Sequence, residues 1–261
     1  MRGLRLSLLF FRIGVLNELQ YRVNFFLQLF QSLVALGTAV AVLALVFRYT
    51  DELGGWSPYE LLAVMGVHIA VGGLIGTVIQ PNMQRLINDV REGTLDYALT
   101  KPEDAQLLVS TREFRIWKGV DVLVGAGVIV TAVVRLQREV APLDALAFVA
   151  AVLLGGVMIY CFWLAITVGA FWVVRMEFIV ELFDGVYQAG RWPVTIYPGW
   201  LRLGFTFLVP LAFAVTVPAE AVTGRLSAAT LAAAAAFAAF LALATRWLWR
   251  AGLRRYSGAS A

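Results

Sequence analysis

The sequence predicts an all-α polytopic membrane protein with six transmembrane helices, an N-terminal interfacial helix and a re-entrant element before the last helix. The first observation is that long stretches carry no charged residue, and each could cross a hydrocarbon core about 30 Å thick as a helix. The second is composition, since 61% of residues are hydrophobic and the mean hydropathy is +0.80. A water-soluble fold of this size could not bury so much apolar surface. Residues 1–261 are therefore expected to form a single membrane domain.

The N-terminal segment, residues 1–23, is predicted to be a helix in the membrane interface. Leu4, Leu8, Phe11 and Val15 recur at helical spacing. Charged side chains occupy the other faces of this helix, where arginines can meet anionic lipid headgroups. Because charges also interrupt the apolar stretch, we do not expect a removable signal peptide.

Five of the six spans follow directly from uncharged apolar stretches. The third is the shortest, because Asp121 must lie close to the membrane surface. The predicted spans are residues 24–47, 60–80, 119–134, 145–174 and 226–247. Residues 81–118 are then a cytoplasmic loop between the second and third spans, and residues 248–261 are a cytoplasmic tail.

A stripe of polar residues marks the segment after the fourth span. They follow one another at spacings of three or four, which places them on one side of a helix. The stripe consists of Glu177, Glu181, Asp184, Gln188 and Arg191. Because acidic side chains are costly in lipid, this side must face water or protein.

Two courses of the chain are compatible with this stripe. In the first, residues 174–190 are the fifth span and residues 191–222 dip into the membrane from the outer side. In the second, the polar helix lies on the cytoplasmic surface and the later apolar run is the fifth span. The turns of the outer region are assigned to Pro193, Pro198, Trp200 and Pro210.

The distribution of positive charge predicts the orientation. Most of the 21 lysines and arginines fall before the first span, between the second and third spans, or after the last one. Since cations collect in cytoplasmic segments, both termini are predicted to lie on the cytoplasmic side of the inner (cytoplasmic) membrane. The cations lie beside the spans rather than in one basic patch, so no nucleic acid partner is expected.

Within the loop 81–118, a short helix is predicted before Lys101-Pro102. Gly93 breaks the preceding helical stretch, while Leu95 and Leu99 mark the apolar side of the next one. Asp96 lies on the side that faces water. A short helix with one apolar and one charged side is suited to docking a cytosolic partner.

Two groups of residues carry a family resemblance. The run Glu92-Gly93-Thr94-Leu95-Asp96, with Leu99 and Lys101-Pro102, resembles the loop after span two in permease subunits of ABC-2 type ATP-binding-cassette exporters. The stretch from Trp192 to Arg202, followed by Val209-Pro210, is similar to a Pro-x-x-x-x-Pro-x-Trp-Leu…Pro signature of a bacterial subfamily of these permeases.

The resemblance implies six spans, a coupling helix between spans two and three, and a re-entrant element before span six, which favours the first course. It implies two copies of an ABC ATPase as partner, together with a second permease that is a related chain or a second copy. The residues implied in ATPase coupling are Glu92, Gly93, Leu95, Asp96, Leu99, Lys101 and Pro102. Because no G-x-x-x-x-G-K-[ST] loop is present, we expect a non-catalytic subunit without its own cofactor, with ATP and Mg²⁺ held by the ATPase.

The acidic residues Glu177, Glu181 and Asp184 leave alternatives open. They are candidates for lining a substrate path, and the simpler interpretation is a packing or interfacial helix with a solvated side. The alternative to an ABC permease is a self-sufficient ion-coupled membrane carrier that uses the same three residues.

The remaining distinctive residues favour structural roles. His68 and Cys161 are single, so no His-pair or cysteine metal site can form within one chain. His68 is expected to be a hydrogen-bonded packing residue. Gly72-x-x-x-Gly76, with Gly66 and Gly73, is expected to let another helix approach closely. Trp200, Trp247 and Trp249 are expected to be anchors at the membrane interface.

Overall fold

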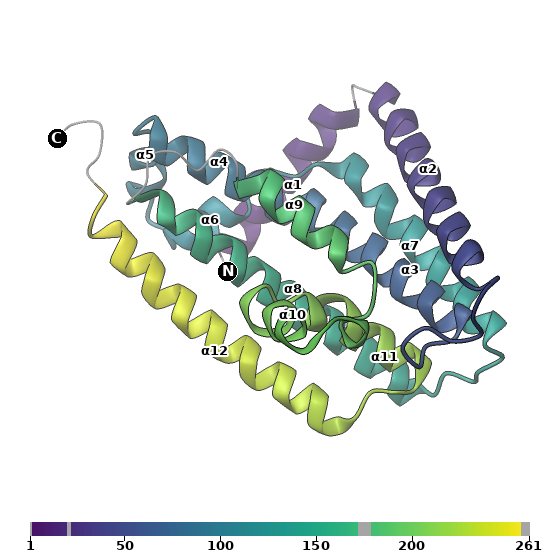
Figure 1. Ribbon diagram of the computed structural model, residues 1–261. Coiled ribbons are helices and arrows are strands. Elements are labelled where there is room, and N and C mark those ends of the chain that lie inside the picture. Colours follow the sequence, from purple (N-terminus) through teal and green to yellow (C-terminus); the bar gives the residue numbers. More distant parts are fainter. Residues whose placement is uncertain (1, 20–21, 172–178, 257–261) are drawn as a thin grey trace.

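The computed structural model describes residues 2–19, 22–171 and 179–256, and helices account for all the regular structure in these ranges except one isolated bridge between Leu53 and Trp56. Figure 1 shows α2 and α12 along opposite edges of the molecule, with the other long helices between them. The α-helices are α1 (Arg2–Leu19), α2 (Arg22–Val46), α3 (Pro58–Leu74), α4 (Gln80–Arg91), α5 (Asp96–Leu99), α6 (Ala105–Ser110), α7 (Gly119–Arg135), α8 (Pro142–Val168), α9 (Ile179–Ala189), α10 (Gly199–Leu203), α11 (Val217–Thr223) and α12 (Ala228–Leu253). Short π and 3₁₀ segments connect them: η1 (Ile75–Ile79), η2 (Ile116–Lys118), η3 (Gly169–Phe171), η4 (Val194–Ile196), η5 (Gly204–Leu208) and η6 (Ala212–Thr216).

Five helical segments of the described chain are long and apolar enough to cross a membrane, and a bent pair of helices brings the number to six if it counts as one span. The segments are Val23–Val46, Pro58–Arg91, Ile116–Arg135, Pro142–Phe171 and Ala228–Leu253. The prediction of an all-α polytopic membrane protein is confirmed. The second segment is the central one, because 56% of its most apolar window is buried inside the protein, against 17–28% for the others.

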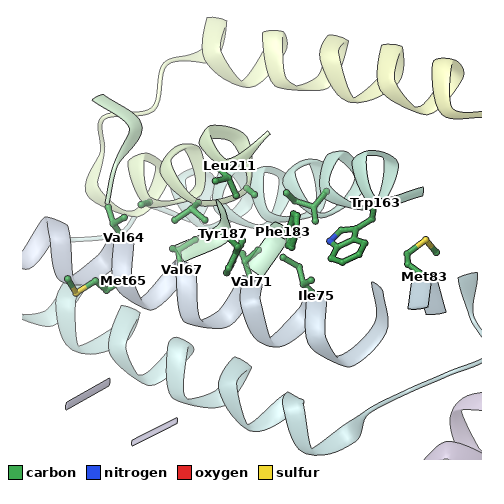
Figure 2. Close-up of a cluster of buried hydrophobic side chains, with 14 of the residues drawn as sticks. Val64, Met65, Val67, Val71, Ile75, Met83, Trp163, Phe183, Tyr187 and Leu211 are labelled. Carbon is green, nitrogen blue, oxygen red and sulfur yellow. The ribbon is translucent and has the colours of Figure 1, made fainter. Parts of the chain in front are cut away.

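The core of the protein surrounds α3. Figure 2 shows Val67 and Val71 of α3 beside Phe183 and Tyr187 of α9, with Trp163 of α8 next to them. These five side chains are at least nine-tenths buried. Since apolar side chains gain little from leaving lipid, close packing of this kind provides much of the association between membrane helices.

Glycines bring α3 and α7 into close contact. A Cβ atom on Gly66 would lie 2.9 Å from the backbone nitrogen of Ile129, and one on Gly125 would lie 2.6 Å from the Gly66 carbonyl. A Cβ on Gly73 would similarly meet the backbone of Val122 at 2.8 Å. The prediction of close helix approach in this span therefore holds, and the glycines that face α7 are Gly66 and Gly73.

The bundle has two ends, which we name after the short helices found there. The α5 end contains α4 to α6 and η2, and the α11 end contains residues 48–57 and 190–198 and the turn after α11. α1 lies at the α5 end, where Glu18 accepts hydrogen bonds from the backbone nitrogens of Ile116 and Trp117.

The contacts of α9 favour the first of the two courses considered above. Asp184 lies near Gln80, Tyr187 near His68, and Thr195 near Trp56, so α9 runs antiparallel to α3 towards the α11 end. Helices α10–η5 and η6–α11 then form the bent pair, with an angle of 79° between them.

This bent pair enters the bundle and returns. Pro210 lies at the bend and lines the same cavity as Cys161, which is in the half of α8 nearer the α5 end. Beyond the bend, a Cβ on Gly155 would touch the backbone of Phe213 at 2.6 Å, and Arg225 is back at the α11 end. Both ends of the pair therefore lie at the same end of the bundle, which is the geometry of a re-entrant element.

Two segments differ from their predicted bounds. The second span continues as a helix through Pro81 to Arg91, because the π-helical turn η1 precedes the proline. The Thr77 carbonyl, which Pro81 cannot bond, accepts a hydrogen bond from the Arg115 backbone nitrogen at 3.0 Å. The last helix extends to Leu253, and Trp249 is 2% exposed against Phe171. The prediction that Trp249 is an interfacial anchor is therefore wrong, whereas Trp247 is 70% exposed.

Candidate functional site

A polar cavity of about 340 Å³ lies between α2, α3, η2, α7 and α9. Gly72 of α3 and Gly76 of η1 line it, together with residues of α2 and α9. Its lining includes His68 and the charged side chains of Lys118, Asp121, Asp184 and Arg191.

Asp121 is held by two residues of α2. It accepts hydrogen bonds from Gln28 Nε2, at 3.2 and 3.0 Å to its two oxygens, and from the Ser32 hydroxyl. Asp121 was predicted to lie at the membrane surface, but these partners were not predicted. Their signal was a Gln28 and a Ser32 four positions apart within an otherwise apolar span.

His68 and Tyr187 pack against each other beside the cavity. Their rings stack with centroids 4.4 Å apart, and the Tyr187 hydroxyl donates a hydrogen bond to the His68 carbonyl at 2.7 Å. Gly72 makes room for this ring, since a Cβ there would lie 3.2 Å from Tyr187. His68 Nδ1 is buried without a hydrogen-bond partner among the described residues. The prediction of a packing histidine holds, but its side chain is stacked rather than hydrogen-bonded.

Only part of the predicted acidic stripe belongs to this cavity. Asp184 lines it and accepts a long hydrogen bond from Gln80 Nε2 at 3.4 Å. Glu181 is exposed and is not part of the lining, and Glu177 lies outside the described residues. Gln188 and Arg191, the stripe's last members, line the cavity together with Asp184 and are linked by a hydrogen bond of 2.7 Å.

The predicted coupling residues divide into a buried and an exposed group. Leu95 is completely buried, and Leu99 is partly buried against the core. Glu92, Lys101 and Pro102 are exposed, whereas Gly93 and Asp96 are intermediate. The apolar side of α5 therefore packs inward, and the charged side is available to a partner.

The most exposed large hydrophobic side chain of this loop, Tyr97, was not predicted from the sequence. Tyr97 is 75% exposed at the surface of α5, while its neighbour Ala98 is 1% exposed. The apolar pattern of the loop did not show that Tyr97 is exposed while Leu95 and Leu99 pack inward, because all three side chains are large and lie close together in the sequence.

A buried asparagine attaches this loop to α4. Asn82 is completely buried, and its Oδ1 accepts hydrogen bonds from the backbone nitrogens of Arg112 (2.8 Å) and Glu113 (2.9 Å). Its Nδ2 donates to the carbonyls of Glu113 (2.8 Å) and Val78 (2.7 Å). Every donor and acceptor of the amide is satisfied. Asn82 therefore holds the end of the loop, at Arg112 and Glu113, against α4 at its start.

Two ion pairs complete the attachment. Arg112 donates to Asp89 at 2.7 Å, with both side chains 14% exposed. Arg246 of α12 donates to both carboxylate oxygens of Asp104, which is the N-cap of α6. This guanidinium lowers the pKa of Asp104, so the carboxylate is ionised at neutral pH.

The outer residues assigned from sequence are spread along the re-entrant element. Pro193 is buried beside Val194, whose backbone nitrogen donates to the Thr216 hydroxyl at 3.2 Å. Pro198 and Trp200 are exposed, Trp200 by 75%, and Pro210 is buried at the bend. They thus mark the start and the bend of the element rather than one shared site.

Comparison with known families decides the class of protein. Residues 33–260 match the family model described as "ABC-2 family transporter protein". The chain belongs to the ABC-2 transporter family. Neither the comparison with curated proteins nor the comparison with solved structures returned a match.

Membership agrees with the resemblance found in the sequence and makes this chain a membrane permease of the ABC transporter type. In an ABC-2 transporter, the polar cavity and the exposed side of α5 lie in different surroundings. The cavity borders membrane-spanning helices, and the exposed side of α5 lies outside them. Among the described residues, no group of three His, Cys, Asp or Glu side chains is arranged to hold a metal ion.

Proposed function

We propose that this chain is the membrane-spanning permease of an ABC exporter and is driven by a separate cytosolic ATPase that docks on α5. The observation that carries the proposal is that one side of α5 is exposed while its other side is packed into the core. Glu92, Tyr97 and Lys101 are exposed, while Leu95 and Ala98 hold the same short helix in the core. A partner that pushes on the exposed side of α5 would therefore move α4 and α12 with it, because α5 is packed into the core.

The ATP chemistry would belong to the partner. The sequence has no phosphate-binding loop, so we expect ATP and Mg²⁺ to be bound by two copies of the ATPase. The α5 end would lie in the cytosol, since it carries most of the chain's lysines and arginines. Both termini would then be cytoplasmic in the cell's inner membrane.

The polar cavity is the proposed segment of the substrate path. It brings Lys118, Arg191 and Asp184 to the side of α3 that lies between α2 and α9. α2 exposes large apolar residues such as Phe26, Phe30 and Leu33. A second permease, either a related chain or a second copy, would pack beside α2 and close the path.

The test is to tag the full chain, purify it from its host in mild detergent, and identify what co-purifies. We expect an ABC ATPase, with hydrolysis that vanadate inhibits. In the variant Tyr97→Ala, the amount of ATPase recovered should fall at least tenfold, because the most exposed contact of α5 is removed.

Tyr49 supplies the matched control, since it is 86% exposed at the α11 end of the bundle. Tyr49→Ala should retain the ATPase. Equal recovery from both variants would contradict docking on α5. Recovery of the chain alone, without hydrolysis, would favour the ion-coupled carrier and make Asp184 the next residue to substitute.

A further inference from the structure

A second cavity, of about 690 Å³, lies on a different side of the bundle from the polar cavity. It is a groove between α3, α6, α8 and α12, and Leu74, Leu153 and Val157 expose 40%, 64% and 43% of their surfaces there. Because these helices cross the membrane, an apolar groove on their outer side is in contact with lipid chains rather than with water.

One end of the groove is polar. Arg246 Nη1 donates hydrogen bonds to Asp104 Oδ1 at 3.0 Å and to Gln106 Oε1 at 2.7 Å. The hydroxyls of Ser110 and Tyr160 lie 2.8 Å apart beside them. Arg246 and Tyr160 are about two turns from the ends of α12 and α8, so this end lies towards the membrane surface of the α5 end.

We propose that the groove binds one phospholipid with a zwitterionic, amine-bearing headgroup. The acyl chain lies along Leu153 and Val157, which are followed on α8 by Tyr160 at the polar end. From Leu153 to Tyr160 the helix rises about 10 Å, which matches the length of roughly eight methylene groups of one chain.

The headgroup assignment follows from charge. Asp104 and Arg246 lie side by side, and their side chains are 42% and 36% exposed. A carboxylate beside a guanidinium complements an ammonium and a phosphate carried by the same headgroup. The pair has no net charge, so an anionic headgroup without an amine gains no net attraction from it.

Gly156 allows the groove to be filled without disturbing the core. It lines the groove, and a Cβ atom built there meets no atom within 4 Å. The substitution Gly156→Leu should therefore occupy the position of the lipid chain. Gly127 on α7 is also exposed with open space around it, so Gly127→Leu is a matched control on another lipid-facing helix.

The experiment uses the full chain with any subunit that co-purifies, placed in nanodiscs of equal parts dioleoyl phosphatidylethanolamine and dioleoyl phosphatidylglycerol. Native mass spectrometry after transfer to mild detergent counts the lipids retained. We expect one phosphatidylethanolamine per chain, retained at least fivefold over phosphatidylglycerol. Gly156→Leu should lose this lipid, Gly127→Leu should keep it, and Asp104→Asn should retain lipid without the headgroup preference.

Three results would overturn the proposal. The first is equal retention of the two lipids by the unmodified chain. The second is the same lipid loss in Gly127→Leu as in Gly156→Leu. The third is no retained lipid together with a dimer that Gly156→Leu dissociates, which would show that a second copy fills the groove. If Gly156→Leu does not fold, the headgroup preference of Asp104→Asn decides between these results and the proposal.

Discussion

The two ends of the bundle are fastened by different chemistry. At the α5 end, the neutral amide of Asn82 is completely buried and binds backbone groups of Arg112, Glu113 and Val78. At the α11 end, the guanidinium of Arg225 is 38% exposed and binds both carboxylate oxygens of Glu60, at 2.7 and 2.8 Å.

The Arg225 contacts extend across the α11 end. Its Nη2 donates to the Gly55 carbonyl at 2.6 Å, and its guanidinium lies 4.6 Å from the centre of the Trp56 ring. Trp56 in turn donates to the Thr195 hydroxyl at 3.0 Å. This arrangement joins the loop after α2, the start of α3, the segment after α9 and the turn after α11.

The two kinds of contact differ in what it costs to break them. A buried amide that binds backbone loses all its hydrogen bonds at once if the segment moves, and water cannot replace them. An exposed ion pair exchanges its partners for water at little cost and weakens with salt. The Asn82 contacts at the α5 end are therefore more costly to break than the Arg225 contacts at the α11 end.

The largest effect is expected from Asn82→Leu. This change removes four hydrogen bonds of a completely buried amide and leaves partly buried backbone groups of Arg112 and Glu113 unsatisfied, so the free energy of unfolding should fall by about 3 kcal/mol. Thermal unfolding in detergent measures the change. Asn88→Leu, on the same helix but only partly buried, should shift the midpoint far less.

A smaller effect is expected from Arg225→Gln. The variant loses an ion pair, in which Arg225 is 38% and Glu60 13% exposed, and a cation–π contact, which together contribute on the order of 1 to 2 kcal/mol. The difference from the unmodified protein should shrink in 1 M salt. Arg48→Gln, an exposed arginine at the same end, provides the comparison. A loss as large as that of Asn82→Leu would refute the contrast between the two ends.

The smallest effect concerns the exposed pair Asp104–Arg246 at the α5 end. Arg246 lowers the pKa of Asp104, so the pair stabilises the protein above the ordinary carboxyl pKa of about 3.9, and the contribution is lost as pH falls through the lowered value. Asp104→Asn should cost a few tenths of a kcal/mol at pH 7. The difference in melting temperature from the unmodified protein should be smaller at pH 3, and an unchanged difference would show that the charge is not involved.

The sequence supported the prediction of the spans better than that of the site residues. Uncharged runs predicted the membrane helices because charge is excluded from hydrocarbon along the whole length of a span. The same reasoning placed the end of the second span at residue 80, whereas a π-helical turn before Pro81 lets the helix continue to Arg91. In the coupling loop, Leu95 and Leu99 were correctly placed on the apolar side of a short helix, which packs inward, but the exposed Tyr97 was missed.

The amino-acid sequence by itself determined that this protein is helical, lies in a membrane and belongs to the ABC-2 transporter family, because each of these depends on residue types and their order along the chain. Only the tertiary structure decided which polar residues meet. Asn82 binds residues 30 and 31 positions away, and Asp104 pairs with Arg246, 142 positions away. Such pairs depend on how the helices pack, and helix packing is decided by the shapes of whole surfaces, such as the glycines of α3 against α7, rather than by any local pattern.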